Sequence, residues 1–352
     1  MDDLVRLTTS IFNWFIFPIS LFILLLLLPP FYLYKLLRWL LIPKFPENMK
    51  SKVVLITGAS SGIGEQMAYQ YAKRGALLVL VARREHALEQ VGECARKVGS
   101  PDVLVAPADV SKPDQCREVI EKALRRFGRI NHLVTNAGFA SFYQFTDITD
   151  ISRFTSIMDT NFWGSVYFTY YAIPHLRRSN GRIIVTASIL GIVPGPNLSI
   201  YNASKAALIH FYKTLRLELG SEVKITIVTP GAMESEFTKG KSLLKDGEMG
   251  IDEIGRDMIL GPLPVEVGES AAARIVDEAC KGARYVVTPP WVRFAGVANL
   301  LAPEIVESLF SLVYRTGPGN DRSTTLSRRL ATPTAKRFCY PESILSPKIK
   351  PD

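Results

Sequence analysis

Hydrophobic and polar positions divide the chain into three stretches with different patterns. The first has no charged residue between Arg6 and Lys35, and its centre reads Leu21-Phe-Ile-Leu-Leu-Leu-Leu-Leu28. In the second, short apolar runs alternate with segments of helical periodicity, and in the third an apolar stretch precedes a basic tail. The pattern predicts an N-terminal hydrophobic anchor over residues 1–45, one large domain over 50–290 and a C-terminal extension over 291–352.

The middle stretch predicts an α/β domain. Seven apolar runs have the length of strands: 53–56, 76–81, 103–106, 132–134, 182–186, 224–228 and 284–287. Five segments between them have apolar residues at helical spacing: 62–74, 84–98, 114–127, 154–177 and 199–219. Such alternation is typical of a doubly wound, Rossmann-type parallel sheet with helices on both faces.

The N-terminal segment is long enough to span a bilayer, since roughly 20 apolar residues suffice. However, Pro18 and the Pro29-Pro30 pair remove backbone donors and oppose a continuous helix, so a bent or re-entrant insertion competes with a spanning helix. Asp2 and Asp3 are unlike the basic start of a signal peptide, which argues against cleavage. The segment is therefore expected to anchor the protein in lipid, either as a spanning helix or as a bent, re-entrant insertion.

The charges after the anchor predict which side the large domain occupies. Five basic residues follow it: Lys35, Arg38, Lys44, Lys50 and Lys52. Because basic flanks remain on the cytosolic side of a membrane, we expect the catalytic domain to face the cytosol.

Composition narrows the possible partners. The formal charge of +9 suits an anionic membrane surface or nucleic acid, but no nucleic-acid-binding motif accompanies it, so we expect no such partner. Four cysteines and four histidines are scattered without ligand spacing. We expect reduced thiols and no metal site.

A glycine-rich octet, Thr57-Gly-Ala-Ser-Ser-Gly-Ile-Gly64, lies between the first predicted strand and a helix. Glycines there allow a tight turn and close approach of the backbone to a cofactor, while the helix N-terminus offers free N–H groups to phosphate. The octet therefore predicts nucleotide contacts at Gly58, Ala59, Ser60, Ser61, Gly62, Ile63 and Gly64.

Two arginines, Arg83 and Arg84, follow the second predicted strand. An NAD-preferring fold places an acidic residue there to hold the ribose hydroxyls. A guanidinium group instead pairs with phosphate oxygens in a fixed fork, which suits the 2′-phosphate of NADP. The expected cofactor is NADP(H).

Tyr201 and Lys205 lie four residues apart in a predicted helix, so they share one helical face. A free tyrosine has a pKa of about 10 and is a poor base near neutrality unless a cation stabilises the phenolate. We expect Lys205 and the nicotinamide ring of NADP⁺ to supply that charge. Ser188, at the end of the fifth predicted strand, can hold a substrate oxygen against Tyr201.

These residues resemble the short-chain dehydrogenase/reductase superfamily in their order and spacing over roughly residues 50–290. The resemblance implies that Asp109 and Val110 contact adenine, that Asn136, Ala137 and Gly138 line the ribose, and that Pro230 and Gly231 border the nicotinamide. It implies that Tyr201 is the general acid or base and that Ser188 orients the substrate. It also implies that Lys205 binds the nicotinamide ribose and tunes Tyr201, and that Asn161 holds a water of the proton relay.

A narrower resemblance covers nearly the whole chain. The proline-interrupted N-terminus, Asp159-Thr-Asn-Phe-Trp-Gly-Ser-Val166 and Tyr340-Pro-Glu-Ser343 are similar to the steroleosins, plant oil-body proteins. The resemblance implies oxidation of sterol or steroid alcohols and the reverse reduction, on a lipid droplet or endoplasmic reticulum membrane. It also implies that Pro18, Pro29 and Pro30 form a proline knob in a hairpin that returns to the same side of the monolayer. Related enzymes are often oligomers, so a homodimer is possible.

Residues 232–266 fall where such folds build a substrate lid. We expect its apolar residues to suit a hydrophobic substrate: Phe237, Leu243, Leu244, Met249, Ile251, Met258 and Leu260. Two other functions stay open. The chain could act on retinoid or other lipid carbonyls, or it could be a structural or sterol-binding signalling protein of oil bodies.

Overall fold

The computed structural model describes residues 1–41, 45–316 and 321–347, which form two compact units, Met1–Phe45 and Pro46–Asp352. The first unit is one run of helix: α1 (Asp2–Ile11), a π-helical turn (Phe12–Ile16) and α2 (Phe17–Leu41). Residues Asp2–Leu37 are long and apolar enough to cross a membrane.

The expectation that prolines oppose a continuous helix is wrong for this segment, because Pro29 and Pro30 lie inside α2. A proline in a helix loses one hydrogen bond and crowds the carbonyl four residues earlier. For Pro18 that carbonyl belongs to Trp14, which lies in the π-helical turn. The wider turn leaves space for the ring, so the helix continues.

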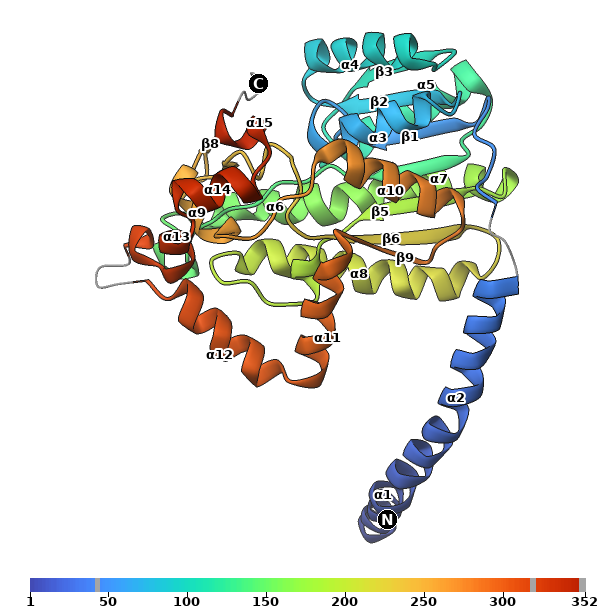
Figure 1. The fold of residues 1–352 in the computed structure, drawn as a ribbon. Helices are drawn as coiled ribbons and strands as arrows, with labels where there is room; N and C mark the ends of the chain where they lie inside the picture. Colours follow the sequence, from blue (N-terminus) through green and yellow to red (C-terminus); the bar gives the residue numbers. More distant parts are fainter. Residues whose placement is uncertain (42–44, 317–320, 348–352) are drawn as a thin grey trace. The chain divides into compact units, whose positions relative to one another are not determined.

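The second unit is built on a seven-stranded parallel sheet in the order β3-β2-β1-β4-β5-β6-β9 (Figure 1). Its strands are β1 (Val53–Thr57), β2 (Leu77–Ala82), β3 (Val103–Pro107), β4 (His132–Thr135), β5 (Arg182–Thr186), β6 (Lys224–Pro230) and β9 (Tyr285–Thr288). All seven apolar runs that predicted strands are therefore strands, and the Rossmann-type fold is confirmed.

Helices cover both faces of the sheet. On one face lie α3 (Gly62–Ala72), α4 (Glu85–Val98) and α10 (Gly268–Cys280), and on the other lie α5 (Pro113–Phe127), α7 (Gly164–Arg178) and α8 (Ser199–Leu219). Alternate strand residues supply the two cores, since Val54 and Ile56 pack with the first set and Val53 and Leu55 with the second. This alternation follows from the two-residue period of a strand.

One predicted helix, residues 154–177, is divided. A 3₁₀ turn (Ile151–Phe154) and α6 (Thr155–Met158) lead into a π-helical turn (Asp159–Trp163), after which α7 begins. Such turns are frequent at functional sites because they redirect side chains. Here the turn carries Asn161.

The lid, residues 232–266, contains the hairpin of β7 (Lys241–Leu243) and β8 (Met249–Ile251), followed by α9 (Glu253–Leu260). After β9 come α11 (Arg293–Leu301), α12 (Pro303–Tyr314), α13 (Leu326–Leu330), α14 (Pro333–Cys339) and α15 (Glu342–Leu345). The described part of the basic tail packs on the lid: Arg322 contacts Asp252 at 2.5 Å, and Tyr340 donates to the Gly261 carbonyl at 2.6 Å.

Candidate active site

A cavity of about 1120 Å³ opens at the carboxyl ends of the strands. Residues directly after β1, β2 and β4 line it, together with the ends of β5 and β6. The chain runs from β1 outward to β3, then returns to place β4 on the other side of β1. Open α/β sheets bind ligands at such a point of reversal.

The glycine-rich loop has the backbone that its sequence predicts. Gly58 and Gly62 have φ of +66° and +58°, a left-handed conformation that favours glycine. A Cβ on Gly58 would lie 2.8 Å from the Ala137 Cα, and one on Gly64 would lie 2.2 Å from the Gly58 carbonyl oxygen. Only glycine fits these close approaches, so the backbone at the start of α3 borders the cavity.

Most of the residues expected to bind the cofactor line this cavity: Gly58, Ser60, Ser61, Gly62, Ile63, Arg83, Arg84, Asp109, Val110, Asn136, Ala137, Gly138, Tyr201, Lys205, Pro230 and Gly231. Ala59 does not, because its side chain is fully buried and its amide donates to the Val81 carbonyl at 3.2 Å. Gly64 lies beneath Gly58 instead. Ala59 and Gly64 therefore support the glycine-rich loop on the side away from the cavity.

The two arginines have different surroundings. Arg84 forms a two-point ion pair with Glu236 of the lid, at 2.9 and 3.0 Å, and also donates to the hydroxyls of Ser60 and Ser61. Arg83 is exposed and makes no hydrogen bond or ion pair within the described parts of the chain. Sequence reasoning missed Glu236, since it is 152 residues from Arg84 and no local pattern connects them.

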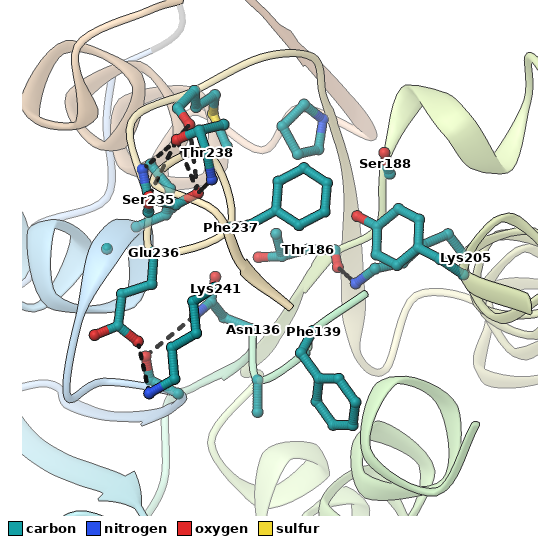
Figure 2. Close-up of a pocket in the computed structure, with 18 of the residues that line it drawn as sticks. Asn136, Phe139, Thr186, Ser188, Lys205, Ser235, Glu236, Phe237, Thr238 and Lys241 are labelled. Atoms are coloured by element: carbon teal, nitrogen blue, oxygen red, sulfur yellow. Dashed lines mark hydrogen bonds and ion pairs between the residues drawn. The ribbon is translucent and has the colours of Figure 1, made fainter. Parts of the chain in front are cut away.

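Tyr201, Lys205 and Ser188 all line the cavity. Lys205 Nζ donates to the Thr186 carbonyl at 3.0 Å and lies 5.7 Å from the centre of the Tyr201 ring. Figure 2 shows Lys205 reaching the end of β5 with Ser188 nearby. The four-residue spacing in α8 brings both side chains to one face, as expected.

Burial changes the pKa of both catalytic candidates. It raises the pKa of Tyr201 to about 12, although a hydrogen bond with Ser188 acts in the opposite direction. It lowers the pKa of Lys205 to about 8. Without a cofactor, the effect of burial on the pKa of Tyr201 thus exceeds the opposite effect of the Ser188 hydrogen bond.

Asn161 is fully buried and does not line the cavity. Its Oδ1 accepts from the Phe139 amide, and its Nδ2 donates to the Ser204 hydroxyl, both at 3.0 Å. A Cβ on Gly138 would lie 2.9 Å from Asn161 Oδ1 and 3.4 Å from Lys205 Nζ. Asn161 therefore lies directly behind the strand end that faces Lys205, and its role in a proton relay stays a prediction.

Apolar residues form much of the cavity wall. Phe237, Met249 and Leu260 of the lid line it, whereas Leu243, Leu244, Ile251 and Met258 do not. The Phe237 ring stacks on the Tyr201 ring, with centroids 5.8 Å apart.

The C-terminal extension supplies a further wall that the sequence did not predict: Trp291, Val292, Ala295, Phe310 and Tyr314. Their apolar character was visible in the sequence, but not the direction in which they point.

Comparisons with known proteins agree with this geometry. Residues 52–244 match the family model described as short chain dehydrogenase. The chain is 46% identical to "11-beta-hydroxysteroid dehydrogenase 1A" of Arabidopsis thaliana, covering 100% of this chain and 99% of that protein. It is 48% identical to "11-beta-hydroxysteroid dehydrogenase A" of Arachis hypogaea, covering 95% and 96%.

A solved structure is also similar. It is an alcohol dehydrogenase from the archaeon Thermococcus sibiricus complexed with 5-hydroxy-NADP, with a TM-score of 0.55, 25% identity and coverage of 68% of this chain and 95% of that one. The protein is an oxidoreductase that belongs to the short-chain dehydrogenase family.

Proposed function

We propose that the protein is an NADP(H)-dependent dehydrogenase of a sterol- or steroid-type secondary alcohol, held on a lipid droplet or endoplasmic reticulum membrane with its active site in the cytosol. The observation that carries the proposal is the cavity, in which Ser188, Tyr201 and Lys205 lie beside an apolar chamber. The steroid-dehydrogenase names of relatives that match the whole chain support this substrate class.

The chain's residues fit a dinucleotide phosphate. The bare glycine backbone at the start of α3 leaves space for a diphosphate, and the N-terminus of a helix attracts negative charge. Arg83, exposed at the rim, is the better candidate for the 2′-phosphate. Arg84 would position Ser60 and Ser61, to which it already donates.

The proposed reaction divides among three side chains. NADP⁺, when bound, supplies the acceptor for the hydride that leaves the alcohol carbon. Ser188 would hold the substrate oxygen by a hydrogen bond, and Tyr201 would accept the hydroxyl proton as the carbonyl forms. Lys205 lines the cavity and, among the described residues, has only the Thr186 carbonyl as acceptor; it would carry the positive charge that favours the phenolate. In the reverse direction Tyr201 returns the proton.

The test is to incubate the purified full-length protein with NADP⁺ and a panel of steroids, retinol and long-chain alcohols. Steroid-dependent formation of NADPH is expected, with a loss of at least about 100-fold in Tyr201→Phe. Equal rates in the wild type and the variant would refute the catalytic proposal. A preference for retinol or fatty alcohols would keep the chemistry and replace the substrate class.

The cofactor assignment has its own test. Arg83→Asp combined with Arg84→Ala should lower the NADP-to-NAD ratio of kcat/KM at least about tenfold, because a charge-assisted pair with phosphate is lost. Arg84→Ala alone serves as the matched control and should change the ratio less. An unchanged ratio in the double variant would refute the NADP assignment.

The anchor is tested by flotation. Deletion of residues 1–42 should reduce the fraction of protein on floating lipid bodies at least about tenfold, because the long apolar helix is lost. Undiminished flotation would assign the attachment to another part of the chain.

A further inference from the structure

The helices α11 and α12 form a corner, defined here as residues 290–314, whose outer surface has no partner within the described parts of the protein. The two helices are bent by 118° relative to each other (Figure 1). No charged residue occurs between Arg293 and Glu304. At the tip, Leu300 and Leu301 are 81% and 78% exposed, far more than a soluble surface normally presents in consecutive leucines.

The side chains of α12 point in three directions. Val306, Phe310 and Tyr314, four residues apart, face inward, and the last two line the cavity. Ile305, Leu309 and Leu312 form an exposed apolar stripe. The polar residues gather on the third side: Glu304, Glu307, Ser308 and Ser311. Separation of an exposed apolar face from a polar face is typical of helices that lie in a lipid interface.

The inner side of α11 reaches the catalytic machinery. Asn299 Nδ2 donates to the Ile192 carbonyl at 3.2 Å, and a Cβ on Gly296 would lie 3.7 Å from Ile189 Cδ1. Ile189 directly follows Ser188. The corner is thus a thin wall, with the substrate chamber on one side and the exposed apolar surface on the other.

We propose that this corner inserts into a lipid surface as a second contact, separate from the N-terminal helix, and that it admits the hydrophobic substrate to the cavity directly from the lipid. Lipid is the occupant that the surface fits, because the tip is convex, uncharged and free of directional polar groups, whereas protein interfaces carry a polar rim. The chain also contains a 36-residue apolar helix with no buried side chain. A second segment of the same chain is therefore suited to lipid.

The test places an environment-sensitive fluorophore on the full-length protein in phosphatidylcholine liposomes. The label is attached at Leu301→Cys in a Cys94→Ser/Cys339→Ser background, where the remaining cysteines, Cys116 and Cys280, are buried. The matched control carries the label on the native, exposed Cys94 of α4 in a Cys339→Ser background. Both proteins keep the N-terminal anchor.

The label at position 301 is expected to shift to shorter wavelength on addition of liposomes and to be quenched by lipids brominated on their acyl chains, while the Cys94 label changes little. Equal exposure of the two labels in liposomes would overturn the proposal. So would a shift that appears without lipid and grows with protein concentration, because a second copy would then cover the corner. None of these readouts requires catalysis.

The second part, substrate entry, rests on the proposed function. Leu300→Asp combined with Leu301→Asp should raise KM for a liposome-dissolved steroid about tenfold or more, since the tip leaves the lipid. The same variant should keep kcat/KM for a short water-soluble secondary alcohol and KM for NADP⁺. A proportional loss with both substrates would refute entry through the corner, and no steroid turnover in the wild type would refute the proposed function instead.

Discussion

A cationic side chain is buried at each end of the parallel sheet, but the two side chains have different partners. At the carboxyl end, Lys205 makes one hydrogen bond to a carbonyl and no ion pair within the described ranges. At the amino end, buried Arg182 contacts Glu47 at 3.6 Å, and Lys52 contacts the same carboxylate at 3.7 Å. The difference predicts a structural role for the ion-paired cluster at the amino end, whereas the charge of Lys205 has no carboxylate partner in the described ranges and stays available to a ligand.

Hydrogen bonds join three members of the amino-end cluster, Tyr71, His132 and Glu47. Burial lowers the pKa of His132, so the neutral ring accepts from the Tyr71 hydroxyl at 3.1 Å and donates from Nε2 to Glu47 at 3.3 Å. The His132 hydrogen bond, aided by Arg182, lowers the pKa of Glu47 to about 2. Through these contacts, Glu47 connects the segment before β1 with the first residues of β4 and β5.

The largest expected effect that separates the two ends comes from Lys205→Met. Activity should fall about 100- to 10,000-fold, because Tyr201 loses its cation. Stability should rise, by about 1–3 kcal/mol at pH 7 without cofactor, because a buried charge whose pKa is lowered to about 8 no longer has to be kept in the fold. The measurements are kcat and urea unfolding. A loss of stability in Lys205→Met would contradict the view that the buried Lys205 charge destabilises the fold.

The pH dependence of the free energy of unfolding also tests the cost of the buried Lys205 charge. Below pH 8 the folded protein must carry the Lys205 charge at a cost, and between pH 8 and 10.5 only the unfolded chain keeps the proton, so stability rises with pH there. The stability difference between wild type and Lys205→Met should therefore shrink as pH rises from 7 to 10.

The next effect is at the amino end. Glu47→Ala should lower the free energy of unfolding by about 2 kcal/mol at pH 7, because Arg182 loses its ion-pair partner and His132 loses its acceptor, with kcat/KM unchanged. Since the pKa of Glu47 is lowered to about 2, this stabilisation is full above pH 4.5 and is lost as pH falls toward 2. Unfolding measured at several pH values tests it; a large loss of kcat at intact stability would contradict a structural role.

The smallest effect is spectroscopic. Because burial raises the pKa of Tyr201 to about 12, the difference in phenolate absorbance between wild type and Tyr201→Phe should stay near zero up to pH 10 without cofactor. Addition of NADP⁺ should produce the phenolate signal at lower pH, since the cation favours it. A signal near pH 8 in the cofactor-free protein would show that Lys205 alone activates the tyrosine.

The sequence predicted the parts of the fold that depend on short-range pattern. Strand runs, the glycine turn and the Tyr201–Lys205 spacing are local features whose structural consequence is fixed by backbone geometry. It did not predict the Arg84–Glu236 pair or the wall formed by Phe310 and Tyr314, because these contacts join distant segments. It also misjudged the prolines of α2, since Pro18 follows a widened π-helical turn and Pro29 and Pro30 lie within the helix.

The contacts between the tail and the lid set an order of events during synthesis. The lid is complete at residue 266, yet its partners Arg322, Tyr340 and Ser343 are synthesised after it. At about 5–20 residues per second, roughly 300 residues separate the end of α2 from Ser343, an interval of about 15–60 s. The apolar helix therefore leaves the ribosome well before the tail can pack on the lid, so the proposed lipid attachment can precede completion of the cavity-bearing unit.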